Sequence, residues 1–231
     1  MRKVLRKMEN KASSKMKKQV IILGAGKSIN EGISKGLWSK IKNKEIWSLN
    51  SMFKIMPYLP TRELWVDISF FRHTVGELQK LAQQGVKLIA KKHLKLSLIP
   101  QIEQFETTKE QSKASEKILY VGTQGLVGLF ALSLAIVKEK YDEVFILGYD
   151  YGTPNINDKV THCYQNKKKE LNIYSTGNIF VYFNKNGTLK REVEDFKYYL
   201  QFSNKIYNVS LYSNIPYFEK ISWEEFFEKI K

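Results

Sequence analysis

The sequence is poor in cysteine, histidine and acidic side chains, and each shortage limits the structures and functions that the chain can have. Its single cysteine, Cys163, rules out an internal disulfide and is compatible with a reducing cytosol. Three histidines without zinc-type spacing do not indicate a zinc site. Only 23 acidic residues stand against 38 basic ones, a net charge of +15, which favours anionic partners such as nucleic acid, an acidic membrane or a phosphorylated substrate. A general enrichment in lysine is the alternative explanation of this charge.

Long apolar segments are missing as well. The longest apolar run, Gly125–Val137, is shorter than the roughly 20 residues of a membrane span. The basic N-terminus is not followed by the apolar stretch of about 7–15 residues that marks a secretory signal. We therefore expect a cytoplasmic protein. Residues 1–18 carry eight basic side chains against one acidic side chain, a net +7, and are expected to form a basic arm suited to DNA or an acidic membrane surface.

Residues 19–231 are expected to form a single nucleotide-binding α/β domain. Short β-branched and apolar runs predict strands at 19–23, 45–50, 63–67, 86–90, 143–147 and 206–209. Apolar residues at helical spacing predict helices near 33–41, 70–84, 125–137, 193–200 and 223–230. This alternation predicts a Rossmann-like, mostly parallel sheet with helices on both faces. Residues 95–117 are predicted to be a long loop, and residues 151–178 an irregular lid.

The candidate site follows from this topology, because ligands of parallel α/β sheets bind at the carboxyl ends of the strands. The turn after the first strand is rich in glycine, and its backbone N–H groups suit an anion at a helix start. Lys27 can compensate phosphate charge, and Asn50 can hydrogen-bond a base or ribose; an exposed lysine and a strand-end cap are the alternatives. The candidate binding residues are Gly24, Gly26, Lys27, Ser28, Asn50, Asp67, Thr123, Gly125, Gly148 and Tyr149.

Two familiar nucleotide motifs are excluded at the glycine turn. Gly26-Lys27-Ser28 resembles the end of a P-loop, but Ile21 stands where that motif requires its first glycine. The dinucleotide-binding fingerprint fails because Ile29 occupies its third glycine position. What survives is a glycine turn that can meet an anion, or a plain tight turn without a ligand.

The order of several segments resembles one enzyme group. Val20–Glu31, Ile46–Ser51, Trp65–Phe70, Thr123–Gly125, Tyr141–Asp150 and Ile206–Ser210 occur in the order of the matching segments there. The group comprises bacterial sialyltransferases of the Campylobacter lipooligosaccharide type, Maf flagellin glycosyltransferases and 6-hydroxymethylpterin pyrophosphokinase-like proteins. The resemblance implies a variant GT-A-like fold and a glycosyltransferase with a nucleotide-sugar donor. Its acceptor would be a glycan, or, given the basic charge, a modified base in phage DNA.

The resemblance also implies a catalytic residue, but this chain differs from the sialyltransferases at its position. Phe183 and Asn184 occupy the place of the sialyltransferases' general-base histidine. His162 is the nearest imidazole, and we predict it as the general base with Asp150 in support, a solvated lid histidine being the alternative. The chain lacks the Asp-x-Asp pair of metal-dependent glycosyltransferases, which favours a reaction without a required cofactor; Mg²⁺ at Asp150 is the alternative.

Two other functions stay open. One is a Mg²⁺- and ATP-dependent pyrophosphokinase of a pterin-like alcohol. The other is a non-catalytic nucleic-acid-binding protein, which only the charge supports.

Overall fold

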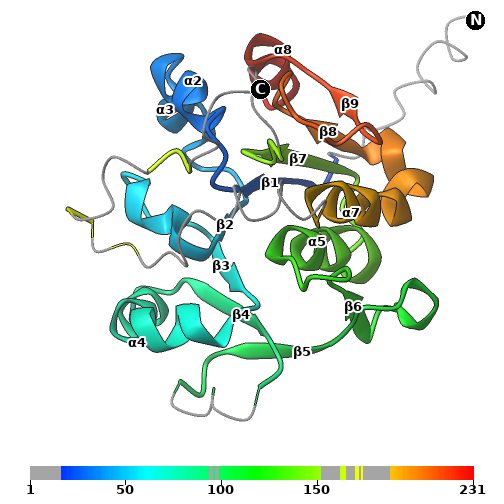
Figure 1. The fold of residues 1–231 in the computed structure, drawn as a ribbon. Coiled ribbons are helices and arrows are strands. Elements are labelled where there is room, and N and C mark those ends of the chain that lie inside the picture. Colours follow the sequence, from blue (N-terminus) through cyan, green and yellow to red (C-terminus); the bar gives the residue numbers. More distant parts are fainter. Residues whose placement is uncertain are drawn as a thin grey trace, which may run out of the picture.

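The computed structural model describes residues 17–93, 96, 99–151, 162–164, 170, 171, 173 and 188–231. These residues form a nine-stranded sheet in the order β6-β5-β4-β3-β2-β1-β7-β8-β9, and every neighbouring pair is parallel. Figure 1 shows the sheet with helices packed on both faces. The expected parallel α/β architecture is therefore confirmed.

The strands alternate with helices along the chain. The strands are β1 (Gln19–Leu23), β2 (Ile46–Leu49), β3 (Arg62–Trp65), β4 (Lys87–Lys91), β5 (Glu103–Thr108), β6 (Ile118–Tyr120), β7 (Glu143–Leu147), β8 (Ile206–Asn208) and β9 (Glu219–Lys220). The α-helices are α2 (Ile29–Ser34), α3 (Leu37–Ile41), α4 (Ile68–Gln83), α5 (Val127–Leu132), α7 (Thr188–Asp195) and α8 (Trp223–Lys229). Tighter or wider turns form η1 (Asn50–Ile55), η3 (Gln111–Lys113), η4 (Ser133–Lys138) and η6 (Phe196–Lys205).

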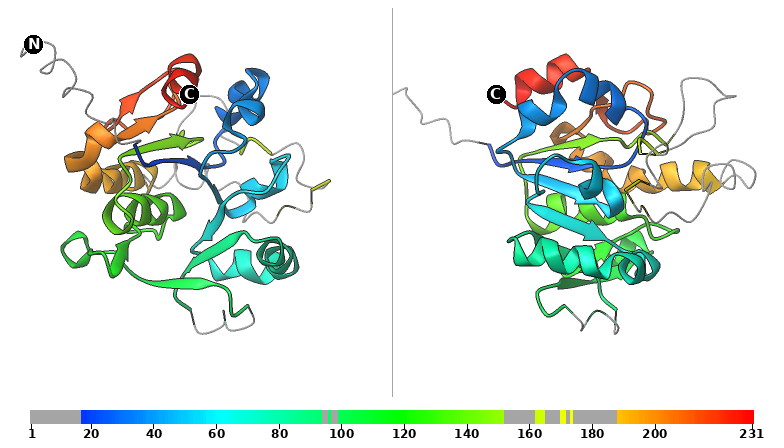
Figure 2. Two further views of the ribbon diagram at one scale, coloured as in Figure 1. Left: turned by 180° about the vertical axis from the view of Figure 1, so that it is seen from behind. Right: turned by 90° about the vertical axis from the view of Figure 1, so that its left-hand side faces the viewer.

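The central strand β1 explains why the fold has three layers. Val20 and Ile22 point into a core shared with α5, η4 and η6, whereas Ile21 and Leu23 point into a core shared with α2, α3 and α8. All four side chains are at most 2% exposed. A strand buried on both faces reads as a continuous apolar run, which is why it was recognisable in the sequence. Figure 2 shows the two helical layers from behind and from the side.

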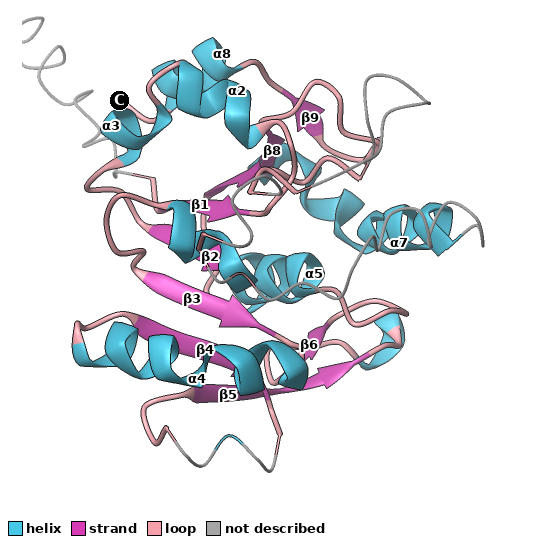
Figure 3. Ribbon diagram, turned by 60° about the vertical axis from the view of Figure 1, so that its left-hand side comes forward, coloured by secondary structure: helices cyan, strands magenta, loops and turns pink. Residues whose placement is uncertain are grey.

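The strand order reverses between β1 and β7. The chain builds β1 to β6 outward on one side and then returns to place β7 to β9 on the other. Val20–Leu23 pairs in parallel register with Val144–Leu147 at the centre of the sheet. The loops that follow β1 and β7 therefore lie side by side at the carboxyl edge of the sheet. Figure 3 shows β3 and β5 pointing toward that edge, where α7 also lies.

The predicted loop at 95–117 was wrong, because β5 and η3 lie within it. Strand β5 pairs with β4 and β6, near one end of the sheet. Its side chains are only half-buried or exposed, so it lacks the apolar signal that marks the inner strands. The edge strands β6 and β9, three and two residues long, also escaped the sequence analysis.

Leu200 was predicted on the buried face of a helix, and this was also wrong. The chain tightens into the 3₁₀ helix η6 at Phe196, where a turn takes three residues. Tyr199, three residues after Phe196, is therefore buried, and Leu200 is 47% exposed.

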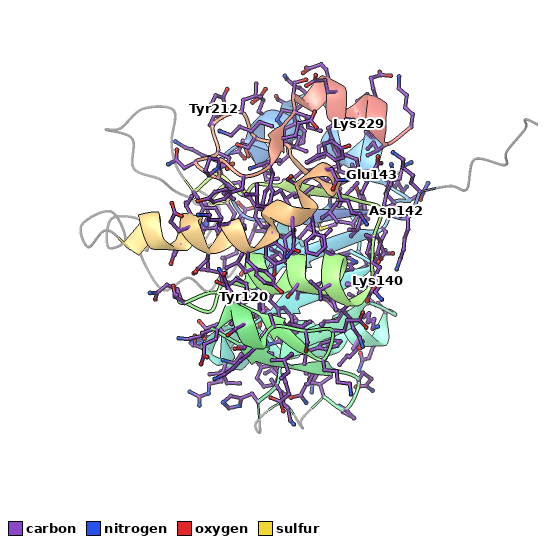
Figure 4. The ribbon with its side chains drawn as sticks, turned by 90° about the vertical axis from the view of Figure 1, so that its right-hand side faces the viewer. Tyr120, Lys140, Asp142, Glu143, Tyr212 and Lys229 are labelled. Carbon is purple, nitrogen blue, oxygen red and sulfur yellow. The ribbon has the colours of Figure 1, made fainter. Side chains whose placement is uncertain are left out.

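The last two residues of the basic arm are fixed to the domain. Lys17 forms an ion pair with Glu143, and the backbone N–H of Lys18 donates to Asp142 Oδ2 at 2.8 Å. Figure 4 labels Glu143 and Asp142 on the side of the molecule opposite to the projecting helix α7. The arm therefore joins the sheet at the edge away from the candidate site; residues 1–16 lie outside the described residues.

Candidate functional site

The loops after β1 and β7 interlock through their glycines. Gly24 N donates to Leu147 O at 2.7 Å, and Gly26 N donates to Gly148 O at 2.9 Å. Gly148 has a left-handed backbone with φ of +70°. A Cβ on Gly26 would lie 2.6 Å from Gly148 O, so a side chain does not fit there. The close packing of the two loops therefore explains why glycine stands at these positions, whether or not a ligand binds there.

Asp150 fixes the start of α2. Its carboxylate accepts from Ser28 N at 2.8 Å and from Ser28 Oγ at 2.6 Å, and the residue is 5% exposed. A helix start favours negative charge, and this carboxylate occupies the place that an anion would take at Ser28. The structure thus reveals a use of Asp150 that the sequence analysis did not foresee: it holds the glycine turn against β7.

A second buried aspartate repeats this arrangement at the loop after β6. Asp195 Oδ2 accepts from Thr123 N at 2.8 Å and from Thr123 Oγ1 at 2.9 Å, while Oδ1 accepts from Tyr120 OH at 2.9 Å. Gly122 and Gly125 have φ values of +71° and +73° in the same loop. Thr123 and Gly125 therefore stand at the carboxyl edge in a loop that Asp195 holds. Figure 4 labels Tyr120 on the half of the molecule from which α7 projects.

Asn50 offers an unused hydrogen-bond acceptor at the end of β2. It has a left-handed backbone with φ of +53°, and its Oδ1 is buried without a hydrogen-bond partner among the described residues. The neighbouring Ser51 Oγ is in the same state. Because β2 pairs with β1 and Leu23 lies opposite Ser48, these polar atoms follow the strand next to the glycine turn. A buried polar atom without a partner is costly unless a water or ligand meets it.

The described part of the expected lid lies over the β1 loop. Cys163 N donates to Ala25 O at 2.9 Å, and Cys163 Sγ lies 3.7 Å from Met52 Sδ. The ring of His162 lies 5.0 Å from that of Tyr164. His162 is thus brought to the carboxyl edge, beside the glycine turn. Burial raises the pKa of the Cys163 thiol to about 12, which speaks against a nucleophilic role for this cysteine.

Three further predicted residues have individual positions. Lys27 is exposed in the glycine turn. Asp67 caps α4, accepting from Ser69 N at 2.8 Å and Ser69 Oγ at 2.6 Å. Tyr149 is 2% exposed, and its ring packs in the core against Gly128, so the backbone of Tyr149 reaches the edge but its ring does not.

Glu192 was missed by the sequence analysis. It is 2% exposed in α7, and its Oε1 has no hydrogen-bond partner among the described residues. The signal lay in the helical pattern: Val193 and Phe196 face inward, and Glu192 and Asp195 precede them at the same spacing.

The described residues show neither a metal centre nor a membrane span. Among them, no three His, Cys, Asp or Glu side chains come together as a metal site. Within the same part of the chain, no helix combines the length and apolar character needed to cross a bilayer.

The fold and the site together define a doubly wound α/β protein whose candidate site lies at the strand-order reversal. No protein-family profile and no curated protein matches the sequence. A solved structure with a similar fold is a Maf glycosyltransferase from Magnetospirillum magneticum AMB-1, with a TM-score of 0.57 and 12% identity. The similarity covers 92% of this chain but 35% of that protein, so this chain spans about a third of its length. At this identity the similarity shows the fold.

Proposed function

We propose that this protein is a glycosyltransferase that uses a nucleotide-activated sugar. The observation that carries the proposal is the unpartnered, buried Asn50 Oδ1 beside the loops at the strand-order reversal. This edge is where doubly wound folds bind nucleotides. The fold shared with a glycosyltransferase supports the same reaction class.

The proposed donor lies across the glycine turn, Asn50 and the loop after β7. Asn50 Oδ1 would accept a hydrogen bond from the base or the ribose. Ser28 N already donates to Asp150 and Gly26 N to Gly148, so these two groups are not the phosphate ligands. Thr123 N and Thr123 Oγ1 likewise donate to Asp195, so exposed Lys27 is the group we propose for phosphate.

The proposed chemistry assigns His162 to proton transfer at the donor end of the site. Cys163 N, next along the chain, donates a hydrogen bond to Ala25 O in the glycine turn, which supports a role for this imidazole at the proposed phosphate. Asp150 supports the arrangement indirectly, because it fixes the turn through Ser28. A required metal is not part of the proposal. The acceptor class is a glycan or a polyanion such as DNA, which the net charge of +15 favours.

Thermal stabilisation by nucleotides tests this proposal on the full chain. Nucleoside mono- and diphosphates and sugar nucleotides should raise Tm, because a ligand that binds the folded state stabilises it. Stabilisation only by ATP with Mg²⁺ would favour a pyrophosphokinase instead. Stabilisation only by duplex DNA, lost on removal of residues 1–16, would favour a nucleic-acid-binding protein.

A matched pair of variants locates the nucleotide. Asn50→Gly and Asn43→Gly each replace an asparagine at positive φ, so the backbone strain changes alike in both. Only Asn50→Gly removes the unpartnered acceptor, and only this variant should lose the nucleotide-dependent rise in Tm. Equal rises in both variants would refute the placement at Asn50.

A further inference from the structure

Helix α7 carries a buried carboxyl group, and one of its two oxygens is not used by any described residue. Glu192 is 2% exposed, and its Oε1 has no hydrogen-bond partner in the described part of the chain. Buried carboxyl groups are normally paired or hydrogen-bonded, because an unpaired one destabilises the folded state. Helix α7 lies at the carboxyl edge of the sheet, on the face opposite to α2 and α3 (Figures 1 and 3).

The neighbour one turn further along α7, Asp195, is in the opposite condition. Its two oxygens accept three hydrogen bonds, from Tyr120 OH, Thr123 N and Thr123 Oγ1. Asp195 is therefore occupied in holding the loop after β6. Glu192, by contrast, keeps an oxygen atom available for a ligand or a proton.

Tyr151 connects Glu192 to the loop at the strand-order reversal. The Tyr151 ring packs at 5.2 Å against Phe196 of the same helical segment, and its carbonyl accepts from Asn214 Nδ2 at 2.8 Å. Its backbone is left-handed, with φ of +45°, a strained conformation for tyrosine. Burial and the nearby Glu192 and Asp195 raise the pKa of Tyr151, so all three groups share one environment.

The protonation equilibrium of Glu192 suits a proton-transfer group. Burial first, and then the neighbouring Asp195, raise the pKa of Glu192 from its ordinary value of 4.5 to about 7. Among the described residues, Asp195 on its own helix and Tyr151 on the facing loop are the titratable groups that interact with it. A base with a pKa near the working pH is the most effective one.

We propose that the Glu192 carboxylate is the general base that takes the proton of the acceptor hydroxyl. This assignment rests on the proposed glycosyl transfer. The acceptor oxygen loses its proton to Glu192 and forms the new bond to the anomeric carbon. The bond from that carbon to the donor phosphate oxygen breaks, and its electron pair leaves with the phosphate. Glu192 then returns the proton to water. His162, at the glycine turn, remains at the donor phosphate on the other side of the β1 and β7 loops.

The activity test compares Glu192→Gln with Glu194→Gln, a neighbouring exposed glutamate on the same helix. Release of nucleotide from CMP-, UDP- and GDP-sugars, with water as acceptor, is followed from pH 5.5 to 8.5. The wild-type rate should rise through about pH 7. Glu192→Gln should lower it about 10²- to 10⁴-fold and abolish the rise, with the nucleotide-induced Tm shift unchanged. Glu194→Gln should match the wild type. A Glu192→Gln variant within a few-fold of the wild type, with the same pH profile, overturns the assignment.

A stability measurement needs no donor. Because the folded protein raises the pKa of Glu192, the wild type should lose stability as the pH rises from about 4.5 to 7, and Glu192→Gln should not. We expect Glu192→Gln to exceed the wild type by roughly 5–15 °C in Tm at pH 8 and to match it at pH 4.5. Burial also raises the pKa of Glu63, but Glu63 is present in both proteins, so its contribution cancels when the two Tm values are compared. Parallel curves would show that Glu192 does not titrate near neutrality and would also overturn the assignment. If the wild type binds no nucleotide and releases none, the glycosyl-transfer proposal itself fails, and the base assignment with it.

Discussion

Replacing Asp150 should destabilise the protein far more than replacing Asp67, although each carboxylate accepts two hydrogen bonds from one serine. Each accepts from the N–H of a serine at 2.8 Å and from its hydroxyl at 2.6 Å. Asp150 is 5% exposed, whereas Asp67 is exposed at the start of α4. The pair therefore compares a buried contact between distant segments, in which both carboxylate oxygens accept, with an exposed local cap, in which Oδ1 alone accepts both hydrogen bonds.

The magnitudes follow from what each substitution leaves behind. Hydrogen bonds to a charged group contribute about 1.5–3 kcal/mol each, and a buried donor without a partner adds its own penalty. Asp150→Ala leaves both Ser28 donors buried and unpartnered, so we expect a loss of about 3–5 kcal/mol. Asp67→Ala removes a solvated helix cap and should cost about 1 kcal/mol. Domains of this kind are stable by about 5–15 kcal/mol, so the Asp150 variant should stay folded but be clearly weakened.

Urea unfolding of the full chain at neutral pH measures both losses. Asp150→Asn, which keeps one acceptor oxygen, should fall between the wild type and Asp150→Ala. If Asp150→Ala costs no more than Asp67→Ala, the carboxylate does not hold the glycine turn, and the account of this loop is wrong. The measurement also separates a loss of activity caused by a loosened turn from a direct role of Asp150 in the chemistry.

Two other substitutions test the same edge of the sheet. Gly26→Ala should destabilise the protein by more than 1 kcal/mol even without nucleotide, because its Cβ would lie 2.5 Å from Asp150 Oδ2. Gly76→Ala, in α4 with no atom within 4 Å of the added Cβ, is its control and should stabilise the protein by about 0.5–1 kcal/mol. His162→Ala should lower turnover about 10²- to 10⁴-fold while nearly preserving donor affinity, as expected for a proton-transfer group. A loss of only a few-fold, mainly in donor affinity, would instead make His162 a lid residue.

Local sequence patterns were sufficient to identify the central strands. The runs at 19–23 and 143–147 are buried on both faces, so continuous apolar character marked them without any tertiary information. The ends of these strands could then be assigned to one edge, because parallel strands share their direction.

The edge strands, and the hydrogen bonding and burial of the polar side chains, could be identified only from the tertiary structure. Strand β5 has no apolar stripe because its place near the sheet's end leaves its side chains partly in water. The strand-end aspartates Asp67 and Asp150 look alike in the sequence, yet one caps an exposed helix and the other holds a buried turn.

Glu192 shows this dependence most clearly. Its helix could be recognised from the spacing of Val193 and Phe196, but its proton affinity arises from burial and from Asp195, together with the loop that carries Tyr151. Residues distant in sequence create that environment, because electrostatic interactions depend on distance in space and on exclusion of water. The sequence alone therefore pointed to the carboxyl ends of the strands as the candidate site, and the folded chain decided which described polar side chains there keep an unpartnered atom.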